Sequence, residues 1–166
     1  MSATERAMLD LIAARHADHQ GHATGMPPRY LVIEQPSVVG VNTAGNGQLR
    51  TLDALVLDRY KVRGHREVHG FEVKVSRSDW LRELRDRTKA GAWEAYCHRF
   101  WLAVPDPDIV RPDELPPGWG MLAPTDGELL PTRPAKLKKH PQPLDNLGDL
   151  IWQAIKTDRR HHRRTP

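Results

Sequence analysis

Two segments of the chain repeat apolar residues at helical spacing, one near each end. Residues 4–18 and residues 144–156 carry them at intervals of three and four positions, which is typical of amphipathic helices. The first apolar stripe consists of Met8, Leu11 and Ile12, and the second of Leu147, Leu150, Ile151 and Ile155. We therefore predict a helix at each end, with each stripe packed on a core.

Between these helices, apolar and polar residues alternate with a period of two, which indicates β-strands. The predicted strands are residues 30–36, 50–60, 70–76 and 100–105, followed by a small hairpin around Asp126-Gly127. Residues 42–48 (NTAGNGQ) are rich in turn-forming residues. Residues 61–70 are predicted to connect the second and third strands as a hairpin.

A helix is predicted directly after the third strand. Ser76 followed by Asp79 resembles a capping box, and Trp80 and Leu84 supply apolar positions behind it. Gly91 is expected to break or kink this helix, with helical pattern resuming on the same or a second helix. Hairpin-linked strands followed by a helical crossover into another strand predict a single α/β domain with a mixed central β-sheet flanked by helices.

The positive charge of the chain is concentrated at its C-terminal end. The net charge is +4, and the segment from Lys156 to Pro166 holds five Lys or Arg residues and one Asp, so the rest of the chain is formally neutral. We divide the chain into a domain spanning residues 1–156 and a basic tail spanning residues 157–166. Such a tail suits contacts with phosphates, but a solvated terminus is an equally good interpretation.

Composition excludes some classes of protein. No apolar run approaches the roughly 18 residues of a membrane span, and the first residues lack the apolar core of a signal peptide. The one cysteine, Cys97, forms no intrachain disulfide. We therefore expect a cytoplasmic protein without a membrane partner.

The third strand contains a Glu-x-Lys pair. Because successive strand residues point to opposite faces, Glu72 and Lys74 share one face, and Phe71 and Val73 share the other. In the preceding strand Asp53 lies among apolar residues, where a carboxylate is costly without a cation. If the two strands pair, Asp53 comes to lie beside Glu72. Two adjacent carboxylates repel each other unless a divalent metal such as Mg²⁺ or Mn²⁺ neutralises them.

Asp53 followed by Glu72-Val73-Lys74 resembles the signature of the PD-(D/E)XK nucleases. The longer strings GFEVKVSRSDWLREL, the W-x-x-Y-C of residues 93–97, FWLAVPDPDIV and ELPPGWGML resemble the MmcB-like branch of that superfamily, small bacterial and phage proteins described as DNA repair proteins or nucleases. The resemblance covers residues 28–125. The signature has a proline before the aspartate, where this chain has Leu52.

The resemblance implies a restriction-endonuclease-like core and a metal-dependent deoxyribonuclease that needs no organic cofactor. Asp53, Glu72 and the Val73 backbone carbonyl would hold Mg²⁺ or Mn²⁺, and Lys74 would orient the attacking water and stabilise charge on the phosphate. Glu34 and Glu5 are both candidates for the additional acid of the superfamily.

Other residues are expected near the site or on DNA. Lys89 and Tyr96 are candidates for residues that border the site. The candidate phosphate contacts are Arg77, Arg159, Arg160, Arg163 and Arg164. A salt-bridged helix surface explains Arg77 equally well.

Two other functional classes remain open at this stage. The first is a non-cleaving DNA-binding or adaptor protein that keeps the nuclease fold. The second is an interaction module in which the Glu72–Lys74 pair is only a surface charge pair. Asp53 argues against this second class, and the intact set of two carboxylates and one lysine favours the nuclease.

Overall fold

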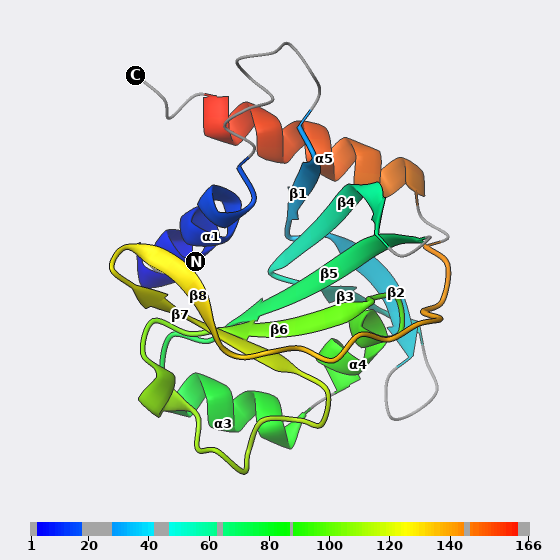
Figure 1. Ribbon diagram of the computed structural model, residues 1–166. Helices are drawn as coiled ribbons and strands as arrows, with labels where there is room; N and C mark the ends of the chain where they lie inside the picture. Colours follow the sequence, from blue (N-terminus) through cyan, green and yellow to red (C-terminus); the bar gives the residue numbers. More distant parts are fainter. Residues whose placement is uncertain are drawn as a thin grey trace.

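A six-stranded mixed β-sheet forms the centre of the computed structural model (Figure 1). The structure describes residues 3–17, 28–41, 47–62, 65–86, 88–144 and 147–162. The strands are β1 (Tyr30–Glu34), β4 (Ala54–Val62), β5 (His65–Val73), β6 (Arg99–Ala103), β7 (Gly120–Thr125) and β8 (Glu128–Arg133), in the order β1-β4-β5-β6-β7-β8. The β5–β6 and β6–β7 pairs are parallel and the other pairs are antiparallel. The predicted single α/β domain with a mixed sheet and flanking helices is confirmed.

Helices cover both faces of this sheet (Figure 1). They are α1 (Ala3–Arg15), α3 (Arg77–Arg85), α4 (Thr88–Glu94) and α5 (Leu147–His162), with a short 3-10 turn η1 (Pro107–Ile109). Apolar residues of α1 pack with Phe71 and Val73 on one face, whereas Trp80 of α3 and Trp93 of α4 pack with Leu102 on the other. The sheet therefore separates two hydrophobic layers. None of the described helices is long and apolar enough to cross a membrane.

The predicted hairpin of the second and third strands is confirmed and is longer than expected. In the β4–β5 pair, Ala54 lies opposite Phe71 and Val62 lies opposite His65. Most of the segment predicted as a connection is therefore strand, because its residues continue the ladder hydrogen bonds of the hairpin. Continuing the same register by one residue places Asp53 across from Glu72.

The segment predicted as one strand over residues 50–60 is interrupted. The strand β3 (Gly47–Thr51) pairs with β2 (Ser37–Val41) in a separate two-stranded sheet, and a bend at residues 52–53 precedes β4. The chain also bends after β1, the strand that pairs with β4, where Gln35 has a positive φ of 53° before Pro36. The Gln35 N–H donates to the Asp53 carbonyl, and the Leu52 N–H donates to the Pro36 carbonyl. This paired bend was not predicted, and it puts Asp53 at a corner of the fold.

The helix after β5 begins as predicted but ends earlier. Ser76 caps α3 by accepting a hydrogen bond from the Asp79 N–H at 3.2 Å. The helix ends at Asp86, which has non-helical dihedral angles, and Gly91 lies inside α4. The predicted break at Gly91 is wrong, because a helical glycine costs only about 1 kcal/mol and the packing of Ala90 and Trp93 outweighs it.

The C-terminal helix differs from the prediction in length and in orientation. It runs from Leu147 to His162, so six residues assigned to the basic tail are helical, and residues 163–166 lie outside the described part of the chain. Among its described side chains, those of Leu150, Ala154 and Thr157 are buried. Ile151 and Ile155, predicted to be on the packed stripe, are exposed instead. Burial of Thr157 turns the helix, because its hydroxyl accepts a hydrogen bond from the Glu34 N–H of β1 at 2.9 Å.

The small C-terminal hairpin is confirmed. Asp126 and Gly127 both have positive φ angles, 52° and 84°, and they join β7 to β8. This is the backbone geometry that Asp-Gly favours in a two-residue hairpin turn.

Candidate functional site

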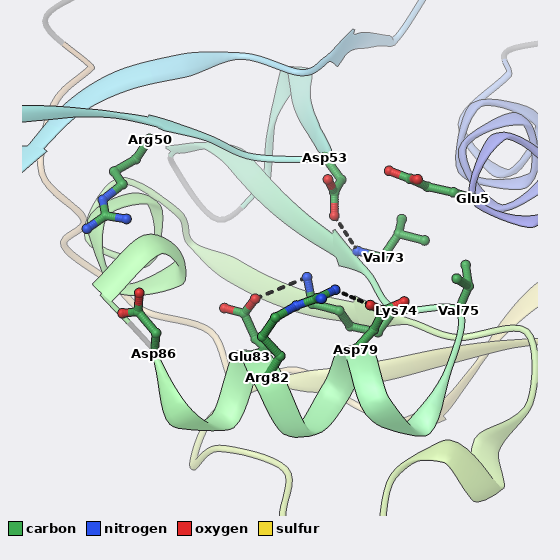
Figure 2. A pocket seen from close by; sticks show the side chains of 10 residues that line it. All are labelled: Glu5, Arg50, Asp53, Val73, Lys74, Val75, Asp79, Arg82, Glu83 and Asp86. Carbon is green, nitrogen blue, oxygen red and sulfur yellow. Dashed lines mark hydrogen bonds and ion pairs between the residues drawn. The ribbon is translucent and has the colours of Figure 1, made fainter. Parts of the chain in front are cut away.

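A pocket of about 360 Å³ opens where β5 ends, between α1, α3 and the corner at Asp53 (Figure 2). Most of its wall is charged. The lining residues are Glu5, Arg50, Asp53, Val73, Lys74, Val75, Asp79, Arg82, Glu83 and Asp86. Five of these carry a carboxylate and three carry a cation, so the wall has a formal excess of negative charge.

The corner between β3 and β4 positions Asp53 in this pocket. Its Oδ2 accepts a hydrogen bond from the Val73 N–H at 2.7 Å, as Figure 2 shows. The carboxylate is therefore held against the last residue of β5. If β4 began before residue 53, the Val73 N–H would donate to a backbone carbonyl of that strand and not to the Asp53 side chain.

Glu72 and Lys74 form a buried ion pair with a third residue, Glu83 of α3. The Lys74 Nζ lies 2.9 Å from Glu72 Oε2 and 3.1 Å from Glu83 Oε2. The side chains of Glu72 and Glu83 are 0% and 8% exposed, and that of Lys74 is 11% exposed. A single ammonium is thus held between two buried carboxylates.

The charges around Lys74 fix its protonation state. Burial by itself lowers the pKa of Lys74, but the carboxylates of Glu72, Glu83 and Asp53 together raise that pKa above its ordinary value. In this arrangement Lys74 stays charged at neutral pH. It can donate hydrogen bonds and supply positive charge, but it cannot accept a proton from water.

The structure therefore brings together the three residues singled out by strand alternation. Asp53 and Lys74 line one pocket, and Glu72, which is not a lining residue, is bound to Lys74. Of the two candidates for an additional acid, one lies at the pocket and the other does not. Glu5 lines the pocket and points towards Asp53 in Figure 2, whereas Glu34 is bound by Arg6 and Arg160 and is not among the lining residues.

Of the two expected border residues, Tyr96 does not line this pocket. Tyr96 follows the end of α4, packs its ring on Trp93 at 6.3 Å between centroids, and lines a different pocket with His98. The early end of α4 at Glu94 explains this, because Tyr96 no longer continues the helical face of Lys89. Lys89 lies on α4, and its side chain is outside the described part of the structure.

The arginines predicted to contact DNA fall into three groups. Arg77 is engaged by both carboxylate oxygens of Glu114 and by the Ile109 carbonyl, which satisfies its guanidinium within the protein. Arg159 is exposed on α5, and Arg160 of the same helix lies 3.4 Å from Glu34. Arg163 and Arg164 lie outside the described residues.

Glu83 is the main site residue that the sequence pattern did not single out. It follows Trp80 by three positions, so it lies on the same face of α3 as a fully buried tryptophan. A carboxylate at the spacing of a buried stripe is a signal for a partnered or functional acid. That spacing was available in the sequence, although the cation that partners Glu83 was not.

The carboxylate oxygens at the pocket are donor atoms that suit a hard cation, but one of these carboxylates, Glu72, already binds the ammonium of Lys74. Carboxylates of Asp53 and Glu72 are the oxygen ligands that Mg²⁺ and Mn²⁺ prefer. Among the described residues, no group of three or more His, Cys, Asp or Glu side chains is arranged to hold a metal ion. A metal at Glu72 would have to replace Lys74 as the partner of that carboxylate. The carboxylates of Asp53 and Glu72 are thus of the kind that a divalent metal prefers, and Lys74 holds one of them in this arrangement.

Comparison with known proteins adds information about the fold. No family model matches the chain, and no curated protein matches it in sequence. A solved structure, the SPO1766 protein of unknown function from Silicibacter pomeroyi, is similar with a TM-score of 0.50 and 22% sequence identity. The match covers 93% of this chain and 86% of that chain. At this identity the similarity shows a shared fold alone.

Proposed function

We propose that this protein is a Mg²⁺- or Mn²⁺-dependent deoxyribonuclease of the MmcB-like branch of the PD-(D/E)XK superfamily. One observation carries the proposal. Asp53, Glu72 and Lys74 meet at the end of the central strand β5, and Asp53 and Lys74 face a common pocket. DNA repair or bacterial and phage DNA processing is the role that the proposal implies.

The excess of carboxylates in the pocket supports metal dependence. With five carboxylates and three cations in its wall, the pocket by itself repels a polyanion such as DNA. A bound divalent cation reverses part of that charge. Asp53 and Glu72, with the Val73 carbonyl, would hold it. When bound, it would lower the pKa of a coordinated water and withdraw charge from the scissile phosphate.

The roles of the protein side chains follow from their contacts. Lys74 acts as a fixed positive charge and hydrogen-bond donor towards the attacking water and the phosphate, since its raised pKa removes it as a base. Glu83 would keep its ion pair with Lys74 when Glu72 binds the metal, because the same ammonium contacts both carboxylates. Arg82, which is largely exposed and lines the pocket, would meet a backbone phosphate.

A second candidate is a non-cleaving DNA-binding or adaptor protein with the same fold. The observation that favours it is the closed ion cluster, in which Lys74 already satisfies Glu72 and Glu83. In such a protein the cluster would be a structural element, and no metal would displace it.

Cleavage assays with two matched variants test the proposal. Glu72→Gln keeps the side-chain volume and removes a metal-binding charge, whereas Lys74→Met keeps the aliphatic stem and removes the ammonium. We expect Glu72→Gln to lose Mg²⁺-dependent cleavage and most of the metal affinity. Lys74→Met should bind metal and DNA but lose cleavage by about 10²–10³-fold, as for a single electrostatic stabiliser.

The controls are two exposed positions, Glu128→Gln and Lys139→Met, which should cleave like the parent protein. The assays use single- and double-stranded DNA with Mg²⁺ and with Mn²⁺. A parent protein that binds DNA but cleaves none of these substrates would establish the adaptor alternative instead.

A further inference from the structure

Helix α5 has two apolar faces. One face carries Leu150 and Ala154, which are buried against the domain. The opposite face carries Ile151, Trp152 and Ile155, which are 52%, 53% and 40% exposed. A surface helix normally turns one apolar stripe inward and a polar face outward, so an outer apolar stripe is typical of a helix covered on both sides.

The exposure of Trp152 stands out within this chain. The other four tryptophans are all buried, Trp80 and Trp93 completely and the remaining pair at Trp101 and Trp119 nearly so. Leu31 on β1, the strand against which α5 packs, is also exposed. Exposed apolar side chains are therefore found on both α5 and the strand that it packs against.

Charged residues flank this apolar stripe in an ordered way. Asp149 is exposed in the first turn of α5, and Lys156 is exposed seven residues later. Seven residues are close to two full helical turns, so both side chains lie on the same side of the stripe. The acid lies towards the N-terminal end of the helix and the base towards the C-terminal end, with the apolar residues between them.

We propose that the outer face of α5 is a two-fold interface between two copies of this chain, with the two helices antiparallel. In a two-fold contact, residue i of one subunit meets residue j of the other, and j meets i. Antiparallel pairing centred between Trp152 and Ile155 places Asp149 against Lys156 of the partner subunit, twice per dimer. It also buries both apolar stripes against each other.

Charge decides this arrangement over a parallel one. In a parallel two-fold pair one flank of the stripe meets the opposite flank of the partner subunit, so Asp149 and Lys156 would find no opposite charge in each other's copies. The antiparallel arrangement keeps both on the same side of the interface and supplies two attractions. A second copy of the chain thus complements the patch in both apolar character and charge, without any other partner.

Measurement of the oligomeric state of this 166-residue chain, by sedimentation velocity and light scattering without metal or DNA, tests this inference. We expect a concentration-dependent dimer. Ile155→Glu should abolish it, because a carboxylate would be buried at the centre of the interface. Circular dichroism should be unchanged, since Ile155 is exposed in the single chain. Lys139→Asp, at an exposed site outside α5, is the control and should dimerise normally.

A charge exchange separates antiparallel pairing from any other association. Asp149→Lys and Lys156→Asp should each weaken self-association about tenfold or more, because each creates two like-charge contacts per dimer. An equimolar mixture of the two variants should form a heterodimer with parent-like affinity. In that heterodimer the introduced lysine meets the introduced aspartate in one contact, and the original Lys156 meets the original Asp149 in the other. The double variant Asp149→Lys/Lys156→Asp should also dimerise.

Three results would overturn the proposal. They are a parent protein that stays monomeric at high concentration, a dimer that Ile155→Glu leaves intact, or a mixture of charge variants that fails to associate. A monomeric parent whose binding of single-stranded DNA falls on Trp152→Ala would assign the face to nucleic acid, with the indole as a stacking platform. These outcomes are independent of whether the pocket at Asp53 cleaves DNA.

Discussion

Glu72 and Glu34 are both buried glutamates, but their charged neighbours differ. Glu72 lies close to another carboxylate that shares its lysine, whereas Glu34 lies between two arginines. Their exposed fractions are 0% and 2%. Glu72 shares one cation, Lys74, with a second carboxylate, and both of these partners line the charged pocket. Glu34 binds two guanidiniums, those of Arg6 in α1 and Arg160 in α5, neither of which lines that pocket.

The difference shows how a buried carboxylate becomes structural or available for chemistry. The single negative charge of Glu34 is neutralised by two guanidiniums, and these contacts connect the two terminal helices to β1. Glu72 shares its cation, because Glu83 and Asp53 also act on the same ammonium. The carboxylates around Lys74 therefore outnumber that one lysine, whereas Glu34 is one buried carboxylate with two guanidiniums.

The largest expected effect comes from neutralising each glutamate in turn. Glu34→Gln should lower the free energy of unfolding by about 2–3 kcal/mol, because it removes the buried anion of a partly buried guanidinium. Glu72→Gln in metal-free protein should cost under about 1 kcal/mol, since it relieves repulsion among carboxylates. Urea titration of both variants, with Glu128→Gln as the control, measures the difference. Equal costs would break the comparison.

Addition of Mg²⁺ should then stabilise only proteins that keep Glu72. At a metal concentration ten times the dissociation constant, binding to the folded state adds about 1.4 kcal/mol. Thermal unfolding of the parent and of Glu34→Gln should shift upward on adding Mg²⁺, and that of Glu72→Gln should not. A shift in Glu72→Gln as large as in the parent would place the metal elsewhere.

The Glu34 cluster is also supported by a hydrogen bond between uncharged groups of α5 and β1. Thr157→Val keeps the shape of the side chain but removes the hydroxyl that accepts from the Glu34 N–H and donates to the Gln153 carbonyl. We expect a loss of about 1 kcal/mol in unfolding free energy, because a buried N–H is left without its acceptor. Thr125→Val, at an exposed position in β7, is the matched control and should change stability little.

The smallest expected effect is that of Glu83→Gln in metal-free protein. Lys74 keeps Glu72 as its partner, so the unfolding free energy should change by only about 0.5 kcal/mol. Asp79→Asn controls for charge on the same helix, since Asp79 pairs with Arg82 instead of Lys74. A double-mutant cycle with Lys74→Met measures the coupling. A loss of about 2 kcal/mol or more would mean that Glu83 is a structural partner like Arg6, and the contrast between the clusters would fail.

Local pattern was enough to predict most elements and one pairing. The alternation around Glu72 and the Ser76 cap depend only on neighbouring residues, and so does the Asp126-Gly127 turn. For that reason they carry over from sequence to structure. The extent of β5 and the position of the break after α3 do not, because a ladder partner extends a strand and packing tolerates a glycine in a helix.

The sequence by itself determined that Glu72 and Lys74 point to the same side of the chain and that Asp53 lies next to the strand that pairs with β5. Tertiary structure alone decided the paired bend that turns Asp53 towards Val73 and the approach of Glu83 to Lys74. It also brought Arg160 to Glu34 across 126 residues and turned Ile151 and Ile155 outward. Periodicity specifies which residues share a face, but the face that is buried depends on which distant element covers it, and that is a property of the assembled fold.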